Sequence, residues 1–215
     1  MSDFDYPDFD YDGWYAEMAD MRDIGPMARH VRRLIFRIAE PITFNSVLDV
    51  SCGQGQLLKE IRERFPDADI YGSEYSQMGL EVAARETPRE RLFLLDLVKD
   101  SLPRTFDLII CSEVLEHILD DRTAIANLHK MTGKYLIVTT IQGQFWPYEQ
   151  EARGHVRSYT RRDLEQKLTE AGFRIRETYE WGWPFFSPIY RNLLAMTKAK
   201  GTTGQYGPVR RLLVS

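Results

Sequence analysis

Apolar residues along the chain alternate between strand-like runs and helical spacing, a pattern that predicts an α/β domain. Five short apolar runs are typical of buried strands, and a sixth segment alternates apolar with polar side chains. These strands are expected at residues 46–50, 68–74, 91–96, 106–111, 134–140 and 173–179. Helical periodicity is expected at residues 26–39, 56–65, 76–87 and 160–171. Strands that alternate with helices favour right-handed βαβ crossovers and a mostly parallel sheet.

The first predicted strand ends in a glycine turn, and a helix follows at once. Residues 46–56 have the sequence Ser-Val-Leu-Asp-Val-Ser-Cys-Gly-Gln-Gly-Gln. Gly53 and Gly55 allow a sharp bend and let a ligand lie against bare main chain. Open α/β sheets bind ligands at the carboxyl ends of their strands, so this turn is the predicted cofactor site. A tight strand-to-helix loop without a ligand is the alternative.

Acidic residues at the ends of three successive predicted strands distinguish between two nucleotide cofactors. Asp49 precedes the glycines, Glu74 ends the second strand and Asp96 ends the third. A dinucleotide presents an anionic pyrophosphate, which Asp49 would repel. S-adenosylmethionine presents a sulfonium and an ammonium, which carboxylates attract. The third glycine of a dinucleotide motif is also missing, because position 58 is Leu, so S-adenosylmethionine is favoured.

With these residues the sequence resembles the class I S-adenosylmethionine-dependent methyltransferases, in particular the type 11 and type 12 group. The resemblance covers about residues 26–180 and rests on the segments 47–55, 72–76, 95–96 and 106–117. The last of these ends in Ser-Glu-Val-Leu-Glu-His and is the most specific. The resemblance implies a Rossmann-like three-layer sandwich. Because residues 209–215 resemble a helix start, an incomplete seventh strand is expected.

The resemblance also implies which residues hold the cofactor. The methionine portion is expected at Asp49, Gly53 and Gly55, with Ser51 in place of a family glycine; the ribose at Glu74; the adenine at Tyr75, Met78, Asp96 and Leu97; and the border with the acceptor at Ser112 and Glu113. The spacing of the cysteines indicates no metal site, and no metal is expected.

Histidines are the candidate catalytic groups. Methyl transfer from a sulfonium needs alignment rather than covalent catalysis, but an alcohol acceptor gains from a general base. His117 and His155 are the candidates by residue type. His117 follows the fourth strand, where a helix-start role is the alternative. His155 lies in a segment that resembles the acceptor side in the family, where loop anchoring is the alternative.

Composition narrows the acceptor and the setting. A net charge of −4 gives no basic field for nucleic acid, so a small molecule, sugar or glycan methylated on oxygen is expected. N-methylation of a small amine and a noncatalytic S-adenosylmethionine-binding module are the alternatives. Two cysteines, no long apolar run and no secretory amino terminus favour a cytoplasmic protein. A monomer or a homodimer is expected.

Three regions are expected along the chain. Residues 1–25 form a flexible arm of acidic and aromatic residues, which is either a plain tail or a lid over the ligand. Residues 26–180 form the methyltransferase domain, and residues 181–215 form an aromatic carboxyl-terminal extension. Within that extension, residues 181–190 are either an irregular packing patch, the wall of an acceptor pocket, or a surface for lipid or a partner.

Overall fold

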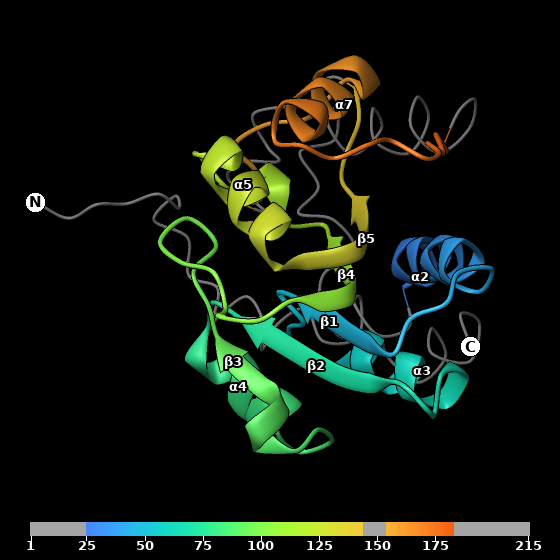
Figure 1. The fold of residues 1–215 in the computed structure, drawn as a ribbon, viewed down its shortest axis with the longest axis vertical. Coiled ribbons are helices and arrows are strands. Elements are labelled where there is room, and N and C mark those ends of the chain that lie inside the picture. Colours follow the sequence, from blue (N-terminus) through green and yellow to red (C-terminus); the bar gives the residue numbers. More distant parts are fainter. Residues whose placement is uncertain (1–24, 144–153, 183–215) are drawn as a thin grey trace, which may run out of the picture.

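The computed structural model describes residues 25–143 and 154–182, which form a five-stranded sheet between two layers of helices (Figure 1). The strands are β1 (Ser46–Val50), β2 (Asp69–Glu74), β3 (Leu92–Leu94), β4 (Phe106–Ser112) and β5 (Thr132–Thr139). They pair in the order β3-β2-β1-β4-β5, and all pairs are parallel. The predicted α/β sandwich is therefore confirmed. The order reverses between β1 and β4, and ligands bind at such a reversal in doubly wound sheets.

Helices cover both faces of the sheet. Their bounds are α2 (Pro26–Ala39), α3 (Gln56–Arg64), α4 (Gln77–Ala83), α5 (Asp121–Met131) and α7 (Arg161–Glu170), with the 3-10 turns η1 (Arg89–Arg91) and η2 (Leu115–His117). The first core lies under α2, α3 and α4, and the second under α5 and α7. Neighbouring strand residues serve opposite cores: Val47 belongs to the first and Leu48 to the second. A sheet covered on both faces therefore needs continuous apolar runs.

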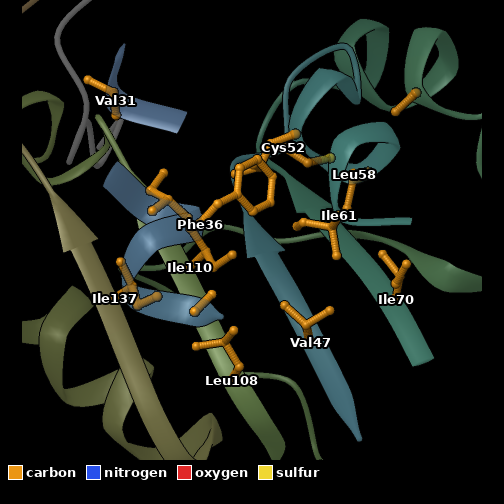
Figure 2. Close-up of a cluster of buried hydrophobic side chains, with 14 of the residues drawn as sticks. Val31, Phe36, Val47, Cys52, Leu58, Ile61, Ile70, Leu108, Ile110 and Ile137 are labelled. Carbon is orange, nitrogen blue, oxygen red and sulfur yellow. The ribbon is translucent and has the colours of Figure 1, made fainter. Parts of the chain in front are cut away.

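The first core also holds the glycine turn in place (Figure 2). Phe36 of α2 and Leu58 and Ile61 of α3 are at most 2% exposed and belong to the same cluster as Cys52 of the turn. Burying a side chain of this kind stabilises the fold by about 1.5–3 kcal/mol. The turn and α3 pack closely against β2, because a Cβ at Gly72 of β2 would lie 2.9 Å from both Cys52 Sγ and Leu58 Cδ1. The packing of α3 thus fixes the turn.

Two predicted elements are present but shorter than expected. Helix α4 ends at Ala83 rather than at residue 87. Residues 84–87 form turns before Pro88, and a proline disfavours helical conformation in the residue before it. Strand β3 spans three residues: Arg91, expected in the strand, belongs to η1, and Asp96, also expected there, accepts a hydrogen bond from Val98 N.

The predicted sixth strand at residues 173–179 is wrong. This segment has no strand structure, and residues 174–180 are exposed. It is attached by side chains instead, with Arg176 over the Tyr135 ring and Arg37 over the Tyr179 ring. A hollow of about 1170 Å³ separates it from β5 and α2. Alternation alone does not make a strand, because the backbone also needs a partner, and no described strand pairs with the outer edge of β5.

Several predictions concern parts of the chain outside the described residues. These are the arm at residues 1–25 except Gly25, the extension at 181–215 except Trp181 and Gly182, and the terminal segment 209–215. Trp181 packs against His30, with the ring centroids 4.6 Å apart. None of the helices that the structure describes is both long and apolar enough to cross a membrane.

Candidate active site

The predicted cofactor residues lie along one edge of the sheet, at the carboxyl ends of the strands. Val50 is in register with Ser73 of β2 and with Cys111 of β4, so the residues that follow these strands meet at this edge. The structure brings together Asp49, Ser51, Gly53 and Gly55 from β1 and its turn; Glu74, Tyr75 and Met78 after β2; Asp96 and Leu97 after β3; and Ser112 and Glu113 at β4.

The β1–α3 turn uses left-handed backbone at three positions. The φ angles are 57° at Ser51, 54° at Gly53 and 86° at Gly55. Glycine adopts this region freely, whereas a residue with a Cβ loses roughly 1–2 kcal/mol. Ser51 therefore occupies a backbone conformation that favours glycine, the residue that the family motif has at this position. Asp49 precedes it on β1 and is 3% exposed.

Glu74 attaches the glycine turn to the start of α4. Its carboxylate is buried, with Oε2 accepting from Gly53 N at 2.8 Å. Its Oε1 accepts from Tyr75 N at 3.0 Å and from Ser76 N at 3.1 Å. Each carboxylate oxygen has two acceptor sites, so Oε2 can also accept from a hydroxyl. The carboxylate thus organises the turn, and its ribose contact stays a prediction.

Gly79, which was not among the predicted site residues, makes room for Glu74. A Cβ at Gly79 would lie 2.9 Å from Glu74 Cγ. Ser76 Oγ accepts from Gly79 N at 3.0 Å and caps the helix. Glycine inside a helix costs about 1 kcal/mol relative to alanine. That local cost was the signal that could have identified the position.

The predicted adenine side combines exposed and buried groups. Tyr75 is 42% exposed and Met78 44%, so both can cover a planar base. Asp96 forms an ion pair with Lys99 at 3.1 Å. Leu97 is buried in the second core, and its carbonyl accepts from Asn127 Nδ2. Any contact of Leu97 with the cofactor is therefore expected from its backbone.

At the end of β4, two side chains are bound to β5. Thr139 Oγ1 donates to Glu113 Oε1 at 3.0 Å and, having a single hydrogen, accepts from Ser112 Oγ at 2.8 Å. Glu113 has a φ of 56°, so non-glycine strain occurs at both strands that flank the reversal of the sheet. Such strain clusters at ligand sites. Thr139 was another residue that sequence analysis missed.

The two candidate catalytic histidines lie together. The rings of His117 and His155 meet edge to face, with centroids 4.7 Å apart. His155 is 5% exposed, whereas His117 is half-buried. His117 Nδ1 lies 3.3 Å from Gly154 O, and Val156 N donates to Glu116 O at 2.8 Å. The His117 ring thus contacts a segment that is distant in sequence, beyond the local bonds of a helix start.

Glu116 is fully buried beneath these histidines. Its Oε2 accepts from Thr140 Oγ1 at 2.8 Å. Burial, followed by the negative charges of Glu116 and Asp49, raises the pKa of the Cys111 thiol. The thiol stays protonated at neutral pH and is a poor nucleophile. This agrees with chemistry that needs no covalent intermediate.

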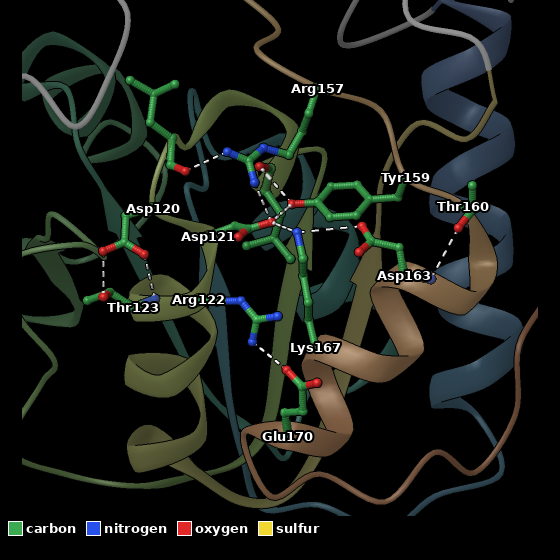
Figure 3. Close-up of polar contacts among 12 residues, drawn as sticks. Asp120, Asp121, Arg122, Thr123, Arg157, Tyr159, Thr160, Asp163, Lys167 and Glu170 are labelled. Carbon is green, nitrogen blue, oxygen red and sulfur yellow. Dashed lines mark hydrogen bonds and ion pairs between the residues drawn. The ribbon is translucent and has the colours of Figure 1, made fainter.

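Asp121 at the start of α5 fixes the segment that carries His155 (Figure 3). Its Oδ2 accepts from Tyr159 OH at 2.6 Å, Lys167 Nζ at 2.7 Å and Arg157 Nη1 at 2.6 Å. Burial raises the pKa of Asp121, but these donors outweigh it and hold the pKa below its ordinary value. Burial, and then the bond to Asp121, raises the pKa of Tyr159. The network joins α5, α7 and residues 154–159.

Comparison with known proteins places this geometry in a family. A family model described as a methyltransferase domain matches residues 22–178. The chain belongs to this family. The resemblance to class I methyltransferases and the S-adenosylmethionine cofactor inferred from the sequence are therefore confirmed. The turn fits that cofactor, since Gly53 and Gly55 lack the Cβ that would project from left-handed backbone and Asp49 supplies a carboxylate beside them.

Individual relatives match only part of their own length. A ubiquinone biosynthesis O-methyltransferase from Idiomarina loihiensis is 33% identical, and the match covers 43% of this chain and 41% of the relative. A trans-aconitate 2-methyltransferase from Methylobacterium radiotolerans is 35% identical over 38% of the chain and 31% of the relative. The solved structure of the [4+2]-cyclase SpnF is 25% identical, with a TM-score of 0.60, and the match covers 80% of this chain and 68% of that one. Because that neighbour is named a cyclase, the fold does not fix the reaction.

Proposed function

We propose that this methyltransferase domain transfers a methyl group from S-adenosylmethionine to a hydroxyl oxygen of a small molecule, sugar or glycan. The observation that carries the proposal is the arrangement at the sheet edge. The glycine turn and Asp49 belong to β1, which pairs directly with β4, and Glu113 and then His117 follow β4 along the chain. The names of two relatives, an O-methyltransferase and a trans-aconitate 2-methyltransferase, support oxygen as the acceptor atom and a small molecule as the substrate.

The residues at the ends of β1 and β2 hold and orient the cofactor in this proposal. The bound cofactor supplies a methyl group that is already activated on a sulfonium. Asp49 attracts its cationic groups, and Gly53 and Gly55 let it approach the main chain. Glu74 accepts from the ribose diol. The adenine contacts are Tyr75, Met78, Asp96 and the Leu97 backbone.

The ends of β4 and β5 serve the acceptor. Ser112 and Glu113 border both substrates, while His117 and His155 help the acceptor hydroxyl to lose its proton. His117 keeps part of its surface exposed and is the member of the pair that an acceptor reaches directly. His155 is buried behind it, with its ring in contact with the His117 ring.

Binding and turnover test this proposal separately. Calorimetry should show saturable binding of S-adenosylhomocysteine and none of NAD, because Asp49 repels a pyrophosphate. Release of S-adenosylhomocysteine is then measured with matched hydroxyl and amine acceptors of similar size. Turnover of amines alone would establish N-methylation, and cofactor binding without turnover of any acceptor would favour a noncatalytic module. Preferential binding of NAD would overturn the cofactor site itself.

A further inference from the structure

Glu116, His117 and His155 form a cluster of metal-ligand type, although sequence analysis expected no metal. One ligand atom from each residue lies within 4.8 Å of the others. Glu116 and His155 are at most 5% exposed, so two of the three donors lie in the protein interior. Two imidazoles and one carboxylate suit zinc or iron better than magnesium or calcium.

The surrounding contacts orient these donors as in known metal sites. His117 Nδ1 faces Gly154 O at 3.3 Å, and a hydrogen on Nδ1 leaves Nε2 as the ligand atom. Thr140 Oγ1 donates to Glu116 Oε2 at 2.8 Å and fixes the carboxylate plane. Metal-bound histidines usually donate their second nitrogen to a carboxylate, a backbone carbonyl or water, and metal-bound carboxylates are usually hydrogen-bonded in turn. The bond from Val156 N to Glu116 O locks together the two segments that supply the ligands.

We propose that Glu116, His117 and His155 bind one divalent transition-metal ion, for which Zn²⁺ is the probe. Donor atoms around a tetrahedral zinc are about 3.3 Å apart, so side-chain movements on the order of 1 Å bring the three atoms into place. The positive charge of the ion balances the buried carboxylate of Glu116. Three protein ligands leave a coordination position open, as in catalytic zinc sites.

The open coordination position takes the acceptor hydroxyl. This role rests on the proposed function, whereas binding of the ion is independent of it. Consecutive threonines connect the two sites, since Thr139 holds Glu113 at the cofactor edge and Thr140 holds Glu116. A coordinated hydroxyl loses its proton to water more easily, because the ion stabilises the oxygen anion. The O–H bond breaks and the proton passes to water, while the oxygen keeps the electron pair. That pair forms a bond to the methyl carbon as the carbon–sulfur bond of the cofactor breaks, and S-adenosylhomocysteine leaves with the electron pair on its sulfur. The proposed substrate is therefore a compound whose hydroxyl group can reach and coordinate the bound ion.

Zinc titration of the full chain tests the site. Protein stripped with a chelator is titrated with ZnCl₂ by calorimetry, and one saturable site per chain is expected. Glu116→Gln and His155→Gln should each weaken zinc binding by at least about tenfold, because each removes a ligand. His129→Gln is the matched control, since His129 packs on the Phe173 ring and should leave zinc affinity unchanged. The absence of a saturable site, or equal affinity in wild type and both ligand variants, would overturn the proposal.

A measurement on the wild type keeps the proposal falsifiable if the variants fail to fold. X-ray absorption of the zinc-loaded protein should show two imidazole ligands and no sulfur. Ligation by fewer than two imidazoles would overturn the assignment. Of the four histidines in the chain, His30 and His129 lie outside the cluster, so loss of the imidazole signal in His30→Gln or His129→Gln would also overturn it. S-adenosylhomocysteine binding is measured on the same metal-free protein. If it binds while zinc does not, the metal site fails and the proposed function stands.

Discussion

Two regions of the proposed active site are built in different ways. The cofactor side is the edge formed by the ends of β1 and β2, and the acceptor side is the proposed acceptor region around His117 and His155. On the cofactor side, Glu74 is held by backbone N–H groups of residues 53, 75 and 76, and the turn depends on glycine conformation. On the acceptor side, Glu113, Glu116 and Asp121 are held by hydroxyl groups and cationic side chains from other elements. A backbone cradle suits a constant ligand, because it changes little when side chains are substituted. Side-chain contacts can be replaced one by one, which suits an acceptor that differs between relatives.

The largest expected effect concerns the histidine pair. His117→Gln or His155→Gln should lower the methylation rate by roughly 10²–10⁴-fold, since help with proton removal is expressed in the transition state. S-adenosylhomocysteine affinity, measured by calorimetry, should stay unchanged because the cofactor side is separate. His129→Gln serves as the matched control for rate. A normal rate in both variants with a proven acceptor would remove the histidines from the mechanism.

The next effect concerns the Asp121 network. Asp121→Asn should lower the free energy of unfolding by about 3 kcal/mol, because Lys167 and Arg157 lose the charge that they share. Tyr159→Phe removes a single donor and should cost only about 1 kcal/mol. Urea denaturation measures both changes. Equal losses in the two variants would show that the ion pairs add nothing beyond the tyrosine hydrogen bond.

The pH dependence of Asp121 gives a second test of the same network. Its pKa is lower in the folded protein than in the unfolded chain, so its stabilisation is complete above the ordinary aspartate pKa of about 3.9. That stabilisation is lost as the pH falls through the lowered folded value. The stability difference between wild type and Asp121→Asn should therefore shrink only below about pH 4. A constant difference down to acid unfolding would contradict this linkage.

The local sequence pattern locates the residues at the strand ends but not their partners that are distant in sequence, for a physical reason. Asp49, Gly53 and Glu74 stand at strand ends that local periodicity locates. Thr140 and Asp121 act only through partners 24 to 46 residues away, which depend on the register of β4 with β5 and on the docking of α7. The alternation at 173–179 failed likewise, since a strand requires a partner that local pattern does not reveal.

A smaller effect is expected where α4 meets Glu74. Gly79→Ala should displace the Glu74 side chain and weaken S-adenosylhomocysteine binding by about 2 kcal/mol, the value of one charge-assisted hydrogen bond. Glu74→Ala should lower both cofactor affinity and thermal stability, because this carboxylate also holds the turn. Glu81→Ala, on the exposed face of α4, is the control and should change neither. Unchanged affinity in Glu74→Ala would move the ribose contact elsewhere.

The smallest expected effect is a gain in stability at Ser51. Its left-handed backbone costs roughly 1–2 kcal/mol. Glycine removes that strain but adds roughly 0.5–1 kcal/mol of unfolded-state entropy. Ser51→Gly should therefore raise the free energy of unfolding by up to about 1.5 kcal/mol.

The matched control for this gain is Gly55→Ala, which introduces a Cβ at a φ of 86° and should destabilise the fold by roughly 1–2 kcal/mol. Opposite signs at two positions of one turn would show that backbone conformation, rather than side-chain contact, governs the cofactor side. A loss of stability in Ser51→Gly would mean instead that the hydroxyl contributes a contact stronger than the strain. The turn would then depend on side chains, as the acceptor side does.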